Sequence, residues 1–170
     1  MKTKLGQIEG VSIKSGSRKS FIEKLVDSKG LPAVKNITVK QSKRWGTGTI
    51  VIPAPKEVDE IMKMVPEGKL TTINEIRAYL ARKHRATIGC PMTTGIFASI
   101  AAHAAEEEAA GGKKIITPYW RTLKVDGSIN EKYPGGVEGQ KKILEKEGHK
   151  IIQKGKKFVV QDLEGHLVKL

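Results

Sequence analysis

The stretch PEGKLTTINEIRAYLARK, residues 66–83, decides how this chain folds. It opens with a turn and runs into a helix, because Thr72 followed by Glu75 is a capping-box pattern typical of a helix start. Upstream, apolar residues at positions 58, 61, 62 and 65 have helical spacing and predict a helix from residue 56. Downstream, a helix is predicted from residue 93 or 94 to residue 110. Two consecutive helices, 72–82 and 93–110, indicate a helix-turn-helix whose connecting stretch is longer than a tight turn.

Shorter elements are expected on both sides of this helical pair. Before it, the pattern predicts a helix over 21–28 and strands over 34–40 and 47–53, joined by a basic stretch. After it, we expect a strand over 113–117, a helix over 137–147, and a hairpin from 151–153 and 158–163. The predicted fold is α+β and mostly α: a winged-helix or helix-turn-helix core of three helices, with short strands and a C-terminal β-hairpin.

Breaks in the pattern divide the chain into three parts. We predict a basic N-terminal segment over 1–55, a helix-turn-helix domain over 56–148 and a hairpin extension over 149–170. Pro53-Ala54-Pro55 is the best boundary, and residues 1–20, rich in glycine, serine and lysine, are expected to be flexible in part.

The charge balance points to a polyanionic partner. The 170 residues contain 31 Lys and Arg against 18 Asp and Glu, a net charge of +13. A surplus of this size favours nucleic acid ahead of an anionic membrane. Three basic clusters, at 82–85, 113–114 and 154–157, support a surface that faces phosphates, although each alone is usually solvated.

Several kinds of site and location are excluded by composition. Cys90 is the single cysteine, which excludes a disulfide framework and a cysteine-rich zinc site, and we interpret it as a structural thiol. The histidines lie far apart, so we expect no metal and no cofactor. The sequence has neither a signal peptide nor a membrane span, so we expect a cytoplasmic protein, associated with the nucleoid if its source is prokaryotic.

The helix over 93–110 has two different ends. Small side chains at 93–95 and at Ser99 let its first half approach a nucleic-acid groove, but ordinary helix packing explains the same pattern equally well. The triplet Glu-Glu-Glu at 106–108 repels phosphates, so this end should point away from nucleic acid; we interpret it as a solvated face. The cluster Pro-Tyr-Trp-Arg at 118–121 either stacks on bases or plugs the core, and composition favours the plug.

Residues 58–148 resemble the DNA-binding and active-site domain of alkylguanine-DNA alkyltransferases, and resemble the alkyltransferase-like proteins, which lack the acceptor cysteine, more closely still. Residues 66–72 look like the family's approach to the helix-turn-helix, and 118–121 occupy the position of its Pro-Cys-His-Arg active site. Asp-Gly-Ser at 126–128, Tyr-Pro-Gly-Gly at 133–136 and the residues from 141 to 148 follow in the family's order.

The departures from this family imply that alkyl transfer is lost. In the family, a cysteine takes the alkyl group from a flipped-out guanine, and a histidine linked through water to a glutamate activates it. Here Tyr119 replaces the cysteine and Trp120 replaces the histidine. A phenol with a pKa of about 10 and no adjacent base is a poor alkyl acceptor. Glu147 matches the glutamate but has no relay partner.

The resemblance also implies which residues contact DNA. Ile73 replaces a tyrosine that pushes on the target phosphate, and Met92 falls near the arginine that fills the space of the flipped base. Met92 is then an apolar wedge, or Arg85 takes this role. The candidate DNA contacts are Thr72, Ile73, Arg82, Lys83, Arg85, Met92, Thr93, Thr94, Gly95, Ser99 and Arg121. The candidate base pocket consists of Tyr119, Trp120, Tyr133 and Glu147.

We therefore expect a DNA-binding protein without catalytic activity. By resemblance, its second helix docks in the minor groove, and its pocket takes an extruded alkylated guanine and flags it for other repair factors. One alternative is a general DNA- or RNA-binding or protein-interaction module whose base pocket is vestigial. The other is an enzyme that uses different residues, for which Tyr119 with Glu147 is the candidate pair.

Overall fold

The computed structural model describes residues 17–170, so residues 1–16 of the predicted N-terminal segment lie outside it. The elements in chain order are α1 (Phe21–Val26), β1 (Ala33–Asn36), α2 (Val39–Trp45), β2 (Thr49–Ile52), α3 (Pro55–Lys63), β3 (Thr71–Thr72), α4 (Ile73–Lys83), β4 (Ile88–Gly89), α5 (Pro91–Ala110), the 3₁₀ turn η2 (Tyr119–Arg121), β5 (Thr122–Leu123), α6 (Gly136–Lys146), β6 (Ile151–Lys154), β7 (Lys157–Val160) and α7 (Leu163–His166). This is the mixed, mostly helical fold that the sequence predicts. None of the described helices is long and apolar enough to span a bilayer.

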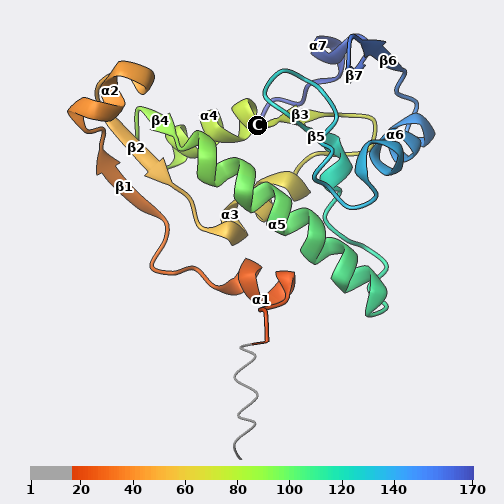
Figure 1. Cartoon of the computed structure of the whole chain (residues 1–170), viewed down its shortest axis with the longest axis horizontal. Helices are drawn as coiled ribbons and strands as arrows, with labels where there is room; N and C mark the ends of the chain where they lie inside the picture. Colours follow the sequence, from red (N-terminus) through yellow and green to blue (C-terminus); the bar gives the residue numbers. More distant parts are fainter. Residues whose placement is uncertain (1–16) are drawn as a thin grey trace, which may run out of the picture.

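The long helix α5 organises the core and crosses the middle of the molecule (Figure 1). Its alanines at 98, 101, 102, 104 and 105 are buried, and α1, α3 and α4 all contact this helix. Small side chains allow neighbouring helices to approach closely. Helices α3 and α4 contribute larger side chains to the same core, among them Met62, Ile76 and Leu80, and Tyr119 and Tyr133 belong to it as well.

The starts of α4 and α5 follow from local chemistry. Thr72 precedes α4, and its side-chain oxygen accepts a hydrogen bond from the Glu75 amide at 3.3 Å, as the sequence pattern predicts. Helix α5 begins at Pro91, two residues or more before the predicted start. Proline suits the first helical position because the amide hydrogen that it lacks has no partner there.

A sheet joins the N-terminal segment to the helical pair. β1 pairs antiparallel with β2, from Ala33↔Ile52 to Asn36↔Thr49, and β2 pairs in parallel with β4 through Ile50↔Ile88. The stretch between α4 and α5 is longer than a tight turn because it contributes this strand. The boundary at residue 55 stays a prediction, and the β2–β4 pairing crosses it.

Two local expectations are wrong. The basic stretch at 40–46 is largely helical, as part of α2, because Thr38 and Gln41 form a reciprocal capping box. The backbone amide of Gln41 donates to Thr38 Oγ1 at 3.3 Å, and the backbone amide of Thr38 donates to Gln41 Oε1 at 3.0 Å. Residues 113–117 form no strand, because no described strand pairs with them, and Ile115 is 85% exposed.

The predicted C-terminal hairpin is present as β6 and β7, paired from Ile151↔Val160 to Lys154↔Lys157. The chain after it returns to the start of the helical pair. The Leu70 amide donates to the His166 carbonyl, and the Val168 amide donates to the Leu70 carbonyl, each at 2.9 Å. Leu70, Leu123, Leu144 and Val160 form a second core cluster at this junction, next to the β3–β5 pair.

Candidate nucleic-acid interface

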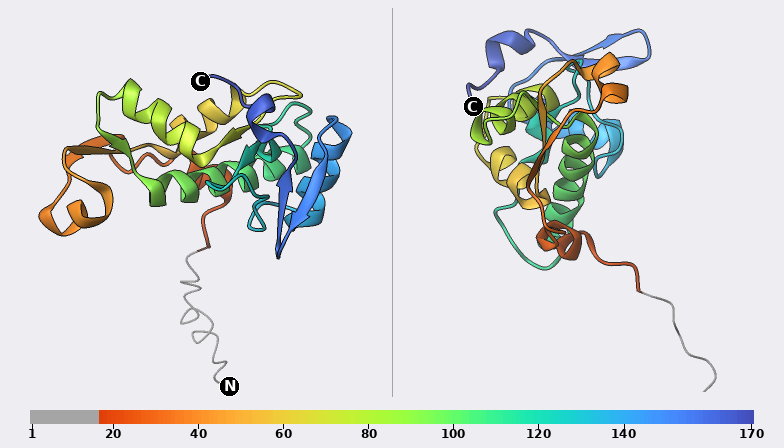
Figure 2. Two further views of the ribbon diagram at one scale, coloured as in Figure 1. Left: turned by 90° about the horizontal axis from the view of Figure 1, so that it is seen from above. Right: turned by 90° about the vertical axis from the view of Figure 1, so that its left-hand side faces the viewer.

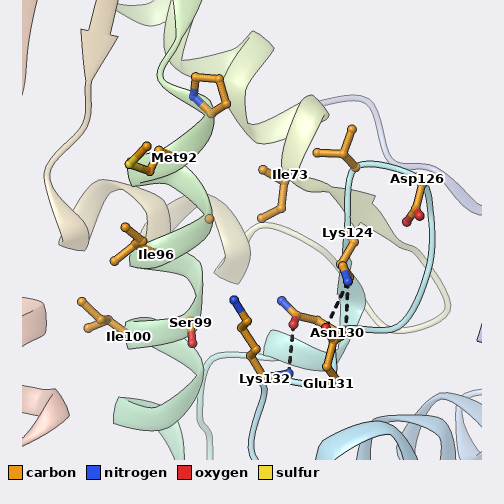
Figure 3. Close-up of a pocket in the computed structure, with 13 residues that line it drawn as sticks. Ile73, Met92, Ile96, Ser99, Ile100, Lys124, Asp126, Asn130, Glu131 and Lys132 are labelled. Carbon is orange, nitrogen blue, oxygen red and sulfur yellow. Dashed lines mark hydrogen bonds and ion pairs between the residues drawn. The ribbon is translucent and has the colours of Figure 1, made fainter. Parts of the chain in front are cut away.

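A groove of about 720 Å³ runs between the first half of α5 and the loop that follows β5. One wall is apolar: Met92 is 66% exposed and Ile96 is 50% exposed, in line with Ile100 along α5. Figure 3 shows this row along one side of α5, and Lys124, Asn130 and Glu131 lie on the loop at the other side of the helix. Exposed apolar side chains gathered in one concavity usually mark a binding surface.

The loop wall is held in place by hydrogen bonds and ion pairs. Lys124 and Glu131 form an ion pair at 3.1 Å. The backbone amide of Asn130 donates to Oε1 of the buried Gln140 side chain at 2.9 Å. Asp126 accepts from the amide and hydroxyl of Ser128 and forms an ion pair with Lys157. The hydrogen bond from Lys157 holds the pKa of Asp126 well below its usual range, so this carboxylate stays charged.

The structure brings together four of the predicted DNA contacts. Ile73, Met92, Gly95 and Ser99 all line the groove, but Ile73 is only 5% exposed and belongs to the hydrophobic core as well. They come from the first turn of α4 and the first half of α5, so the predicted helix end does form one wall. Thr93 lies beside them on α5 and is half-buried.

Several other predicted contacts are turned inward or paired. Thr94 is fully buried and donates its hydroxyl to the Cys90 carbonyl at 2.6 Å, and Thr72 is buried as the α4 cap. These two side chains therefore do not reach a partner, contrary to the sequence prediction. Arg121 donates to the Val65 carbonyl and to Glu147, so its guanidinium is also engaged within the chain.

The basic cluster at the end of α4 lies away from the groove lining. Arg82 donates to the Leu170 carbonyl at 2.8 Å, and Lys83 pairs with Glu57 at 2.8 Å. Arg85 is exposed and adopts a left-handed backbone with φ of 52° just after α4. None of these three side chains lines the groove, so Arg85 has no place as a wedge there.

The predicted base pocket is filled by its own aromatic rings. Tyr119 and Tyr133 are each 2% exposed, and Tyr119 meets Trp120 and Tyr133 edge to face, with ring centroids 5.2 and 5.7 Å apart. The Tyr119 hydroxyl donates to Glu106 Oε1 at 2.7 Å. None of these aromatic residues lines the groove. The four residues come together as predicted, but they form the plug that composition favours.

Glu147 anchors this plug to the rest of the chain. It accepts from Trp120 Nε1 at 2.8 Å and from the Arg121 guanidinium at 2.7 Å. Burial by itself raises the pKa of this carboxyl, but the hydrogen bonds from Arg121 and Trp120 outweigh burial and hold the pKa below its usual value. Glu147 is therefore a charged structural group. Burial and the Glu106 hydrogen bond raise the pKa of Tyr119 far above its usual value, so its phenol stays protonated.

The acidic triplet of α5 lies at the surface, as the sequence predicts, but its carboxylates have partners within the chain. Glu106 receives the Tyr119 hydroxyl, and Glu108 pairs with Lys113 at 2.8 Å. Glu107 accepts from the Phe21 and Ile22 amides at 3.0 Å and so caps the start of α1. All three lie in the second half of α5, away from the groove residues of its first half.

The sequence prediction missed part of the groove. Ile96, Lys124, Val125, Asn130 and Lys132 line it as well. The i, i+4, i+8 spacing of Met92, Ile96 and Ile100 was a usable signal, because it places one apolar row on a helix whose alanines already form another. The loop residues carry no comparable signal, because only the tertiary fold sets them across from α5.

Comparisons with known proteins identify a shared fold. No protein-family model matches the chain, and no curated protein matches it. A crystal structure of S. pombe ATL in complex with DNA is similar, with a TM-score of 0.51 and 22% identity over 68% of this chain and 94% of that one. Another, of S. pombe Atl1 in complex with damaged DNA containing O6-carboxymethylguanine, has a TM-score of 0.48 and 23% identity over the same shares. At such identities the likeness concerns the fold.

Proposed function

We propose that this protein binds duplex DNA without catalysis, with the first half of α5 directed into the minor groove. The observation that carries the proposal is the groove itself, in which Met92, Ile96 and Ser99 face solvent on one helix opposite a fixed loop. Apolar side chains of this kind act as wedges in minor-groove complexes. The fold shared with a protein solved in complex with DNA supports the same partner.

The charge distribution around the groove favours a polyanion. Lys132 at the groove and Lys154 and Lys156 on the hairpin are exposed, and none of them forms an ion pair with another described residue. The acidic triplet lies at the opposite end of α5, where its charges are engaged. Cations near the apolar wall of the protein groove suit the phosphates that border the minor groove of a duplex. With a DNA partner, we place the protein in the cytoplasm, at the nucleoid in a prokaryote.

The surroundings of Tyr119 argue against group transfer. A nucleophile needs a deprotonated atom that reaches its substrate. The phenol is buried, its pKa is raised, and its hydroxyl donates a hydrogen bond to Glu106, while Glu147 is occupied by Arg121. The candidate enzyme pair of Tyr119 and Glu147 thus shares no hydrogen bond and no open pocket.

The packed Tyr119 ring also argues against recognition of an extruded damaged base. An extruded guanine that entered the predicted pocket would have to displace the Tyr119 ring, in addition to the few kcal/mol that extrusion costs. We therefore propose a general duplex-binding protein whose base pocket is filled, in preference to a sensor of alkylated guanine.

A fluorescence-anisotropy titration tests the proposal. The protein is titrated into three labelled nucleic acids, an unmodified duplex, the same duplex with one alkylated guanine, and an RNA hairpin, at two salt concentrations. We expect similar, strongly salt-dependent affinity for the two duplexes and weaker binding to RNA. Tighter binding of the alkylated duplex than of the unmodified duplex would establish a lesion sensor instead. Absence of duplex binding at physiological salt would overturn the DNA proposal.

The groove is tested with a pair of variants. Met92→Ala/Ile96→Ala removes two exposed side chains from the apolar wall and should weaken duplex binding about tenfold, since the apolar area that they would bury against DNA contributes on the order of 1–2 kcal/mol. Ile115→Ala is the control, because Ile115 is an apolar side chain that is even more exposed, at 85%, but lies outside the groove. Equal affinities for both variants and the wild type would show that DNA binds elsewhere.

A further inference from the structure

The segment from residue 28 to residue 56 contains no acidic residue. Its basic residues are Lys29, Lys35, Lys40, Lys43, Arg44 and Lys56. We call residues 33–52 of this segment, from β1 to β2, the basic arm. Its cations at 35, 40, 43 and 44 are exposed, and none forms an ion pair within residues 17–170.

Helix α2 presents these charges without serving the core. It has 7 residues and none of them is buried. Lys40, Lys43 and Arg44 follow the i, i+3, i+4 spacing, so they share one face of the helix. A helix this short has little stability of its own and usually depends on packing of an apolar face. Helix α2 buries no such face, and its cations form no ion pair with a described residue that would stabilise the fold. Packing and pairing within the described chain therefore do not explain its concentration of charge.

The basic arm is anchored next to the start of α5. The Thr87 amide donates to the Thr49 carbonyl at 3.1 Å, and the Cys90 amide donates to the Val51 carbonyl at 2.9 Å. Cys90 directly precedes Pro91 and Met92, which line the groove. In Figure 1, α2 lies beyond the first turn of α5, at the end of the molecule opposite α6 and the β6–β7 hairpin. Figure 2 shows the same separation from above.

We propose that the basic arm binds the phosphate backbone of the same duplex, past the end of α5, through Lys40, Lys43 and Arg44. This inference rests on the proposed function. Double-stranded DNA carries about one negative charge per 1.7 Å of its axis, so a duplex seated in the groove continues as a dense row of phosphates beyond the site. A helix face with three cations, at one end of the groove, suits that continuation. Such cations add affinity and orientation without sequence preference.

The test compares two variants with the same change in net charge. Lys40→Gln/Lys43→Gln/Arg44→Gln neutralises the face of α2. Lys142→Gln/Lys146→Gln/Lys150→Gln neutralises three exposed lysines on and just after α6, which also lack ion pairs within the described chain. Affinity for an unmodified duplex is measured by anisotropy across a salt series, and circular dichroism confirms that both variants are folded.

We expect the α2 variant to bind about tenfold more weakly, or weaker still, at physiological salt. The slope of log affinity against log salt should become shallower by about 0.9 for each phosphate that the variant no longer neutralises. The α6 variant should retain nearly the wild-type slope. Equal weakening in both variants would reveal a general charge effect and overturn the role of the basic arm while leaving DNA binding intact. A wild-type protein without duplex affinity would overturn the proposed function, and the arm's role with it.

Discussion

Tyr119 shows how a single residue closes a site. Its ring fills the space between Trp120 and Tyr133, and its hydroxyl is fixed by Glu106. We expect Tyr119→Ala to destabilise the protein by about 3–5 kcal/mol, since deleting a buried ring leaves a cavity. Tyr119→Phe keeps the ring and removes one hydrogen bond, so it should cost about 1 kcal/mol. Urea unfolding of both variants checks the difference; similar small effects would mean that the ring is not packed as described.

His149 should make stability depend on pH. It is 4% exposed, meets His166 edge to face, and neither ring nitrogen has a hydrogen-bond partner among the described residues. Burial lowers its pKa below 6.5; His166 and Arg121 lower it further, and Glu147 opposes them. As pH falls, His149 is therefore protonated in the unfolded chain before it is protonated in the folded one. The stability that depends on neutral His149 is complete above pH 6.5 and is lost progressively below it.

Urea midpoints at about pH 7.5 and pH 5 measure this effect. We expect the wild type to lose stability at the lower pH and His149→Leu to lose clearly less. If the two proteins show the same pH dependence, other groups carry the titration.

At the scale of elements, α4 and β4 approach each other closely just before α5 begins. A Cβ on Gly89 would lie 2.6 Å from the Arg77 carbonyl oxygen, whereas a Cβ on Gly95 would meet no atom within 4 Å. Gly89→Ala should therefore destabilise the protein by about 1–3 kcal/mol, because backbone must shift. Gly95→Ala, inside α5, should stabilise it by up to about 1 kcal/mol. Thermal unfolding of the pair tests this close approach, and equal effects would contradict it.

Helix α5 combines two roles along one element. Its alanine face lies in the core, its second half binds α1 through Glu107, and its first half exposes Met92 and Ile96 at the groove. Any variant that shifts this helix therefore affects stability and the proposed DNA contact together. For this reason the groove test above uses exposed side chains only.

At the scale of the whole molecule, the chain end completes the junction beside the groove. Leu70, just before α4, exchanges hydrogen bonds with His166 and Val168 and lies in a cluster with Val160 of the hairpin. Removing residues 161–170 should unpair Leu70 and uncover this cluster. We expect a lower unfolding temperature, by about 2–4 °C for each kcal/mol of stability removed, and still one transition. Calorimetry of the shortened chain tests this expected decrease. An unchanged unfolding temperature would show that residues 161–170 do not contribute to the stability of the fold.

The sequence alone determined the elements whose signals are local. The Thr72 cap, the helical spacing around residue 61, the C-terminal hairpin and the positive charge all follow from neighbouring residues, because caps, periodicity and turns act over a few positions. The mostly helical α+β class was predictable for the same reason. The capping box of α2, Thr38 with Gln41, is a local signal of the same kind, although the sequence prediction did not include it.

Only the tertiary structure decided what the functional residues do. The sequence grouped Tyr119, Trp120, Tyr133 and Glu147 correctly, but whether they enclose a space or fill it depends on rotamers and packing set by α5 and α6. It could not show that Thr94 faces inward, that Arg121 is held by Glu147, or that the loop with Lys124 lies beside the first half of α5. These facts depend on contacts between segments far apart in the chain, and no short-range pattern records such contacts.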